Sequence, residues 1–233
     1  MAKKVIRLTE QDLVGILKNI LSGKLPNLKD KDFFTNLIPN LKDLSSLGDG
    51  ESDENSVDIK NISLKGQELL KNPIFKQKVK EISNEIGVDE SSIIKLMKHE
   101  SGLDSSVKNS IGCVGLIQFC PDNRGGSSKT INGKSYNLSD LQNDLELQLD
   151  AIKEFWSKGK RDGKIKTAKD LYVYNFFPVA AGKSDDYVLQ TKGLSAEKIA
   201  RANPVFNKTL GRPINTPLTV GDLTDYYQMK GMV

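Results

Sequence analysis

Apolar residues recur at helical spacing near the start of the chain. Within residues 9–22 they fall at relative offsets of 0, 3, 4, 7 and 8, which lie on one side of an α-helix. Thr9 with Asp12 forms a capping-box pattern, and Gly23 follows the last turn. The sequence therefore predicts an amphipathic helix over 9–22. Its apolar face comprises Leu13, Ile16, Leu17, Ile20 and Leu21.

Helical patterns also dominate the chain beyond residue 60, and most of them begin at a capping residue. Asn72-Pro73 begins a helix that Gly87 ends. Asp89 caps the next helix, which runs to Glu100. We further expect a long helix from Ser139 through Trp156, one from Thr167 to Pro178, and shorter ones that begin at Ser195 and Thr219.

The segment between the second and third of these helices has a different composition. Residues 102–137 are rich in Gly, Ser and Asn, and Asn132-Gly133 is a dipeptide typical of tight hairpin turns. We therefore expect a long loop or a small β element here. The predicted fold class is mainly α, with this region following the helix that ends at Glu100.

Composition divides the chain near residue 60. Residues 48–58 contain five acidic residues, no basic residue and two glycines, a composition typical of a flexible linker. We therefore expect three parts. They are an N-terminal amphipathic helix at 1–22, a linker region at 23–60 and one folded domain at 61–233.

Bulk properties exclude several classes of protein. No run of about 18 apolar residues occurs, so we expect no membrane span. The basic start of the chain is followed by Glu10, Gln11 and Asp12, which interrupt any apolar core of a signal peptide. Residues 59–233 carry 26 basic and 20 acidic residues, a surplus that suits an anionic polymer. Because no Lys/Arg-rich run alternates with aromatic residues, we expect a cell-wall polymer before nucleic acid.

The chain has two cysteines, Cys113 and Cys120, and one histidine. Two cysteines do not make a disulfide framework, and with a single histidine they do not supply a zinc ligand set. We interpret both cysteines as small buried apolar residues, and we expect no metal site and no cofactor.

Glu100 is the first candidate for chemistry. Ile93, Leu96 and Met97 precede it by seven, four and three residues, which places Glu100 on their apolar helix face. Loss of water favours the protonated form of a carboxyl group, and a carboxylic acid kept neutral near pH 7 can donate a proton to a leaving group. A solvated glutamate in a last helical turn is the simpler alternative.

The residues that follow Glu100 favour the chemical interpretation. Three glycines indicate backbone bends or a close approach of the backbone. The amide of Gln118 lies among apolar neighbours, where it needs hydrogen-bond partners. This segment resembles the signature of the soluble lytic transglycosylase and goose-type lysozyme superfamily. The matching positions are Glu100-Ser101, Asn109-Ser110, Gly112, Gly115-Leu116-Ile117-Gln118-Phe119 and Pro121. Apolar replacements stand at Cys113, Ile117 and Cys120.

The resemblance extends over about residues 72–190 and implies a lysozyme-like α+β fold and cleavage of peptidoglycan. It implies that Glu100 is the catalytic acid and base. It also implies that Ser101, Gln118 and Phe119 bind the sugar or orient Glu100. The family's Tyr-Asn pair corresponds to Tyr174-Asn175, although Tyr172 is an alternative partner for Glu100. The product implied is a 1,6-anhydro sugar.

Two other functions remain open at this point. A hydrolytic lysozyme needs a second acid, for which Asp104 and Asp122 are the nearby candidates. A virion structural protein that binds glycan without cleaving it has no need of an acid at Glu100. We interpret His99, which points about 100° away around the helix, as a structural or surface residue and not as a base.

Residues 5–13 resemble a leader found on some virion proteins of tailed bacteriophages. This resemblance implies that residues 1–22 contact other virion proteins and that the enzyme reaches the wall in the phage particle. An ordinary amphipathic helix packed on the folded domain is the alternative.

Overall fold

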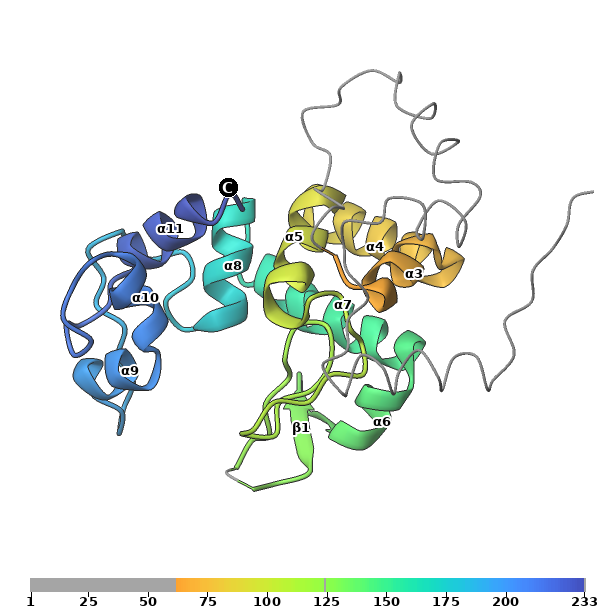
Figure 1. Ribbon diagram of the computed structural model, residues 1–233, viewed down its shortest axis with the longest axis horizontal. Helices are drawn as coiled ribbons and strands as arrows, with labels where there is room; N and C mark the ends of the chain where they lie inside the picture. Colours follow the sequence, from red (N-terminus) through yellow and green to blue (C-terminus); the bar gives the residue numbers. More distant parts are fainter. Residues whose placement is uncertain (1–61, 124, 233) are drawn as a thin grey trace, which may run out of the picture. The chain divides into compact units, whose positions relative to one another are not determined.

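The computed structural model describes residues 62–123 and 125–232, which form a mainly helical domain with one two-stranded sheet (Figure 1). This confirms the predicted fold class. The predicted helix at 9–22 and the linker at 23–60 lie outside the described residues. The elements are α3 (Leu64–Lys71), α4 (Pro73–Ile86), α5 (Glu90–Ser101), β1 (Ser128–Ile131), β2 (Lys134–Asn137), α6 (Leu138–Asn143), α7 (Leu145–Arg161), α8 (Ala168–Phe176), α9 (Ala196–Ala202), α10 (Pro204–Thr209) and α11 (Val220–Met229).

Local capping explains where most helices begin. The Asn72 side chain accepts hydrogen bonds from the first turn of α4, and Gly87 ends that helix at a φ of 71°. Thr167 and Asp170 form a reciprocal capping box on α8. These contacts satisfy backbone N–H groups that have no partner within the helix. They confirm the predicted starts of α4 and α8. The predicted starts of α5, α9 and α11 are confirmed at Asp89, Ser195 and Thr219.

The long helix predicted from Ser139 is wrong, because two helices occupy this region. Asp144 has an extended backbone (φ −119°, ψ 104°) that separates α6 from α7, and its side chain accepts from the Leu147 N–H. Asn137, not Ser139, caps α6. An aspartate at this position stabilises a second helix start more than it stabilises helix continuation. The short helices α3 and α10 were not predicted.

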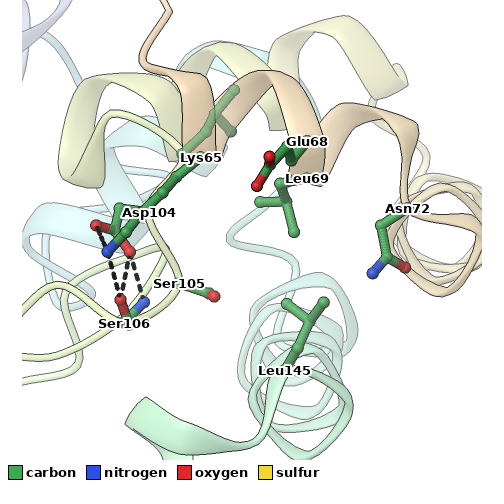
Figure 2. Close-up of a pocket in the computed structure, with 9 residues that line it drawn as sticks. Lys65, Glu68, Leu69, Asn72, Asp104, Ser105, Ser106 and Leu145 are labelled. Carbon is green, nitrogen blue, oxygen red and sulfur yellow. Dashed lines mark hydrogen bonds and ion pairs between the residues drawn. The ribbon is translucent and has the colours of Figure 1, made fainter. Parts of the chain in front are cut away.

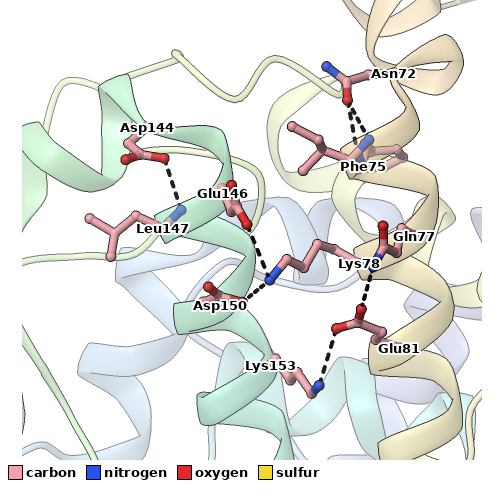
Figure 3. Close-up of polar contacts among 11 residues, drawn as sticks. Asn72, Phe75, Gln77, Lys78, Glu81, Asp144, Glu146, Leu147, Asp150 and Lys153 are labelled. Carbon is pink, nitrogen blue, oxygen red and sulfur yellow. Dashed lines mark hydrogen bonds and ion pairs between the residues drawn. The ribbon is translucent and has the colours of Figure 1, made fainter.

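Helices α4 and α7 pack together and form the centre of the core. At their edge, Lys78 Nζ lies 2.6 Å from Asp150, and Lys153 Nζ lies 3.3 Å from Glu81 (Figure 3). Half-exposed ion pairs of this kind stabilise a protein by less than about 1 kcal/mol each. The packing of the two helices therefore depends on apolar burial. The buried apolar side chains on them are Phe75, Val79, Ile82, Ile86, Leu149, Ala151, Ile152 and Trp156.

The hairpin expected at Asn132-Gly133 is present. Both residues have positive φ, 51° and 83°, and strands β1 and β2 pair antiparallel on either side. The Tyr136 hydroxyl donates to Glu154 Oε2 at 2.6 Å, and the Asn132 side chain donates to the Glu154 carbonyl. The hairpin is therefore attached to α7, which carries Glu154.

The C-terminal helices pack on α8 through aromatic rings. The ring of Phe206 lies 4.8 Å from that of Phe176 and 4.5 Å from that of Tyr226. The Tyr172 hydroxyl hydrogen-bonds to the carbonyl oxygens of Ser92 and Met232, so it joins α5 to the end of the described chain. None of the described helices has the length and apolar character that a membrane crossing requires.

Candidate active site

Glu100 lies in the last turn of α5, two residues before the Gly102 that ends the helix at a φ of 63°. Ile93, Leu96 and Met97, which share its helix face, are fully buried. Glu100 itself is half-buried. The helix therefore holds a carboxyl group at the border between the apolar core and the surface, as the apolar spacing predicts.

This environment changes the acidity of Glu100. Burial raises the pKa of its carboxyl from the usual 4.5 to about 7, while a hydrogen bond from Asn175 acts in the opposite direction. Asn175 Nδ2 donates to Glu100 Oε1 at 3.3 Å. Desolvation dominates because the charged form loses more from burial than one amide donor returns. A group with this pKa can both donate and accept a proton near neutral pH.

Asn175, on the last turn of α8, is the side chain that the structure brings to Glu100. Its Oδ1 is buried and has no hydrogen-bond partner among the residues of the structure. A buried acceptor without a partner is costly. A ligand hydroxyl or amide that donates to this oxygen would remove the cost.

Both tyrosines considered as partners of Glu100 point elsewhere. Tyr174 is 4% exposed and its ring packs on Phe155 at 4.9 Å. Tyr172 is fully buried and bonded to backbone carbonyls. Each tyrosine is accordingly placed as a core side chain of α8, and the structure records no hydrogen bond between Glu100 and either of them.

Two further candidates also have structural contacts. The Ser101 hydroxyl donates to the Met97 carbonyl at 2.8 Å within α5. Phe119 is 4% exposed, and its ring lies 6.0 Å from that of Phe155. These contacts hold the helix end and the following segment in place, and neither is made to Glu100.

Residues 113–120 form a tight loop, which we call the Gln118 loop. Val114 and Phe119 exchange backbone hydrogen bonds of 3.0 and 2.9 Å across it. Gln118 has a φ of 56°, and its Nε2 donates to the Gly115 carbonyl at 2.9 Å. A positive φ is uncommon for a residue other than glycine. The Gly115 carbonyl is therefore a hydrogen-bond partner of the kind that the sequence predicts for the Gln118 amide.

The expectation for the cysteines is wrong in one respect. Cys113 is buried, as predicted, but Cys120 is exposed, and the two sulfur atoms form a disulfide across the Gln118 loop. Because the backbone pairing of Val114 with Phe119 brings the flanking residues together, the Cα atoms of the cysteines lie 3.9 Å apart. Composition did not reveal this contact, since it depends on the loop conformation.

Reduction of this disulfide is expected to lower the free energy of unfolding by about 2 kcal/mol, because a bond over a short loop restricts the unfolded chain. Denaturant unfolding with and without a dithiol reductant measures the difference. The double variant Cys113→Ala/Cys120→Ala is the control, and its midpoint should not respond to reductant. Equal midpoints for the oxidised and reduced wild type would contradict the prediction.

Two tyrosines of the C-terminal helix α11 also belong to the surroundings of Glu100. Burial raises the pKa of Tyr226 and of Tyr227, and the charge of Glu100 raises both further. The Tyr226 hydroxyl lies 3.4 Å from His99 Nε2. The family resemblance ends near residue 190 and so assigns no role to these tyrosines. In the sequence, the adjacent pair Tyr226-Tyr227 is the feature that could have indicated an aromatic contribution to the site.

The carboxylates that a hydrolase would need are engaged elsewhere. Asp104 lies 2.9 Å from Lys65 Nζ and accepts two hydrogen bonds from Ser106 (Figure 2). Although burial raises the pKa of Asp104, the contacts with Ser106 and Lys65 hold it below the usual 3.8. Asp122 accepts from the Thr130 N–H and pairs with Lys129. Neither is recorded in contact with Glu100.

The site therefore has one acid with a pKa near neutrality, held at a helix end beside an amide. Within residues 62–123 and 125–232, no group of three or more His, Cys, Asp or Glu side chains could hold a metal ion. The mainly helical domain agrees with the lysozyme-like fold that the sequence resemblance implies.

Comparison with protein families gave a match over the central part of the domain. Residues 77–181 match the family model described as the transglycosylase SLT domain, so this part of the chain is a domain of the SLT type. The match includes Glu100, the Gln118 loop and Asn175. It supports a peptidoglycan-degrading activity of the lytic transglycosylase type. Searches of curated proteins and of solved structures gave no match.

Proposed function

We propose that this protein is a peptidoglycan lytic transglycosylase. It cleaves the β-1,4 bond between N-acetylmuramic acid and N-acetylglucosamine and leaves a 1,6-anhydro end. The observation that carries the proposal is Glu100, whose pKa is about 7 and whose recorded polar partner is an amide, not a second carboxylate. Glycosidases that activate water generally use two carboxyl groups. A single carboxyl is sufficient when the nucleophile belongs to the substrate.

The reaction needs two proton transfers at Glu100. The protonated carboxyl first donates to the glycosidic oxygen, and the bond between this oxygen and C1 of the muramoyl residue breaks. The ionised carboxylate then accepts the proton of the muramoyl 6-hydroxyl as its oxygen bonds to C1. Glu100 ends in its starting state and no water is consumed. A pKa near the working pH makes both steps accessible to one group.

Asn175 and the Gln118 loop supply polar groups for the sugar. The Asn175 amide nitrogen holds Glu100 Oε1, which leaves its buried Oδ1 to accept from a substrate donor. Gln118 uses its nitrogen within the loop, and its side-chain oxygen can accept from a substrate hydroxyl or N-acetyl N–H. These contacts would hold the muramoyl residue while Glu100 exchanges protons.

Digestion of purified sacculi in ¹⁸O-labelled water tests this proposal. A transglycosylase should release soluble fragments whose new muramoyl ends carry no label, because the attacking oxygen comes from the sugar. A two-carboxyl lysozyme run in parallel is the positive control for labelling. Label at the new ends would show hydrolysis, and absence of any soluble fragment would favour a glycan-binding protein.

We also propose that the protein is carried in a bacteriophage particle and acts on the bacterial cell wall. Support comes from the resemblance of residues 5–13 to leaders on virion proteins and from the amphipathic pattern at 9–22. The acidic composition of residues 48–58 would allow the N-terminal segment and the enzyme domain to work separately. Residues 1–22 would then contact other virion proteins.

Deletion of residues 1–22 should abolish incorporation into particles and leave the cleavage of sacculi within about twofold of the full chain. Immunoblots of purified particles and a turbidity assay measure the two outcomes. A variant that keeps the segment but replaces Leu13 and Leu17 by Asp removes only the apolar face. Normal incorporation of both variants would rule out this role.

A further inference from the structure

Gln148 is a fully buried polar residue on α7 whose side chain joins three separate segments of the domain. Its Oε1 accepts from the Leu116 N–H at 2.8 Å, and its Nε2 donates to the Ser105 carbonyl at 3.0 Å. The same Nε2 donates to the Leu141 carbonyl at the end of α6. Both ends of the amide are therefore used, as expected for a buried glutamine.

Two of these segments carry the active site. Ser105 lies five residues after Glu100, and Leu116 lies two residues before Gln118. One amide thus bonds both the chain that leaves the catalytic helix and the loop that carries Gln118. Gln148 itself is not recorded in contact with Glu100 or Gln118.

The backbone of the Gln118 loop lies against the Gln148 amide. A Cβ atom added at Gly115 would lie 2.5 Å from Gln148 Nε2, closer than such atoms approach in proteins. Gly115 also has a φ of 76°, which glycine adopts without strain. The glycine therefore permits the close approach that the Leu116 bond requires.

The internal bonds of the loop do not fix where the loop lies. The exchange between Val114 and Phe119 and the disulfide hold its own shape. Its placement depends on bonds to other segments. Cys113 and Gly115 bond to the preceding segment, at Asn109 and at the Val107 carbonyl, and Leu116 bonds to Gln148. Of these bonds, the one to Gln148 is made by a side chain of the core helix α7.

We propose that Gln148 is a positioning residue that sets the location of Gln118 relative to Glu100. This inference rests on the proposed function, because it assigns Gln118 to substrate binding. Loss of the Gln148 amide would leave the Leu116 N–H without a partner in a buried place and would remove the bond to the Ser105 carbonyl. The loop would then move, and substrate binding through Gln118 would weaken while Glu100 kept its acidity.

A double-mutant cycle of Gln148→Met and Gln118→Ala tests the proposal. Methionine has a similar length and no amide, so it removes the bonds with little change in volume. Gln148→Met alone should lower kcat/KM on soluble glycan strands by about tenfold or more, chiefly through KM. In that background, Gln118→Ala should add less than about twofold, because residues that act through one another are not additive. The pH dependence of kcat should stay that of the wild type.

Gln142 provides a matched control. Its Nε2 donates to the Ser106 carbonyl at 2.7 Å, beside the Ser105 bond, but it has no recorded bond to the Gln118 loop. Gln142→Met should leave kcat/KM within about twofold of the wild type and should be additive with Gln118→Ala. If both glutamines behave alike, the effect belongs to the 105–106 segment and not to the Gln118 loop, and the proposal fails.

Binding measurements separate this proposal from the proposed function. The same cycle is repeated in the Glu100→Gln background, with the Kd for uncrosslinked glycan strands as readout. Coupled losses of affinity support the positioning role even if the wild type does not cleave sacculi, whereas cleavage by the wild type with additive losses overturns it. Should Gln148→Met unfold, Gln148→Glu takes its place in the cycle. Because it keeps the Leu116 acceptor, Gln118→Ala should then show its full wild-type effect, and a coupled loss would overturn the proposal.

Discussion

Glu100→Gln should lower the rate of sacculus clearing by at least about 10²–10⁴-fold, the range that a positioned proton donor contributes. The amide has nearly the same shape as the carboxylic acid, but it can neither protonate the glycosidic oxygen nor accept the proton of the 6-hydroxyl. Because burial raises the pKa of Glu100 to about 7, its carboxyl group is mostly neutral below that pH. A neutral amide can therefore occupy the same partly buried position. We therefore expect the variant to fold and to bind glycan.

Glu90→Gln is the matched control for this substitution. Glu90 stands in the first turn of the same helix and is exposed. It should clear sacculi at the wild-type rate. Clearing by Glu100→Gln at a rate close to that of Glu90→Gln would remove Glu100 from the catalytic role.

The second large effect concerns pH. Glu100 must be protonated to begin the reaction, and burial raises its pKa to about 7. The protonated fraction is nearly complete at pH 5 and falls tenfold for each pH unit well above 7. We therefore expect kcat/KM to be about 100-fold lower at pH 9 than at pH 6, if substrate binding is unchanged.

Asn175→Leu is the control for this pH profile, because it should shift the pKa of Glu100 in a known direction. The hydrogen bond from Asn175 lowers the pKa of Glu100, so its removal should move the fall in kcat/KM to higher pH. Initial rates at low substrate concentration, measured from pH 5 to 9, record the shift. A fall centred near pH 4.5 in the wild type would mean that burial does not control the acidity of Glu100.

Much of the helical fold could be predicted because the determining interactions are local. Asn72, Asp89 and Thr167 cap the helices that follow them within three residues, so short sequence patterns contain the necessary information. The hairpin at Asn132-Gly133 is local in the same way. The predicted long helix from Ser139 misses the break at Asp144, because an aspartate within a periodic apolar pattern can either continue a helix or begin a new one.

The family resemblance assigns Glu100, Gln118 and Asn175 to one candidate site, whereas the other surroundings of Glu100 depend on tertiary contacts. Four consecutive residues of α8, from Leu171 to Tyr174, are buried, so periodicity could not show which tyrosine faces Glu100. Gln148 contacts the Gln118 loop over a separation of 32 residues. Tyr226 and Tyr227 lie outside the matched domain, at 77–181. No local pattern connects these residues with Glu100.

The mass of the released muropeptides tests the central claim most directly. After complete digestion of sacculi and treatment with borohydride, a single-carboxyl transglycosylase should leave muramoyl ends that are one water lighter than the reducing sugar and that resist reduction. The account predicts these anhydro ends from the wild type and none from Glu100→Gln. Reducible muramoyl ends from the wild type would contradict it, because they require water as the nucleophile.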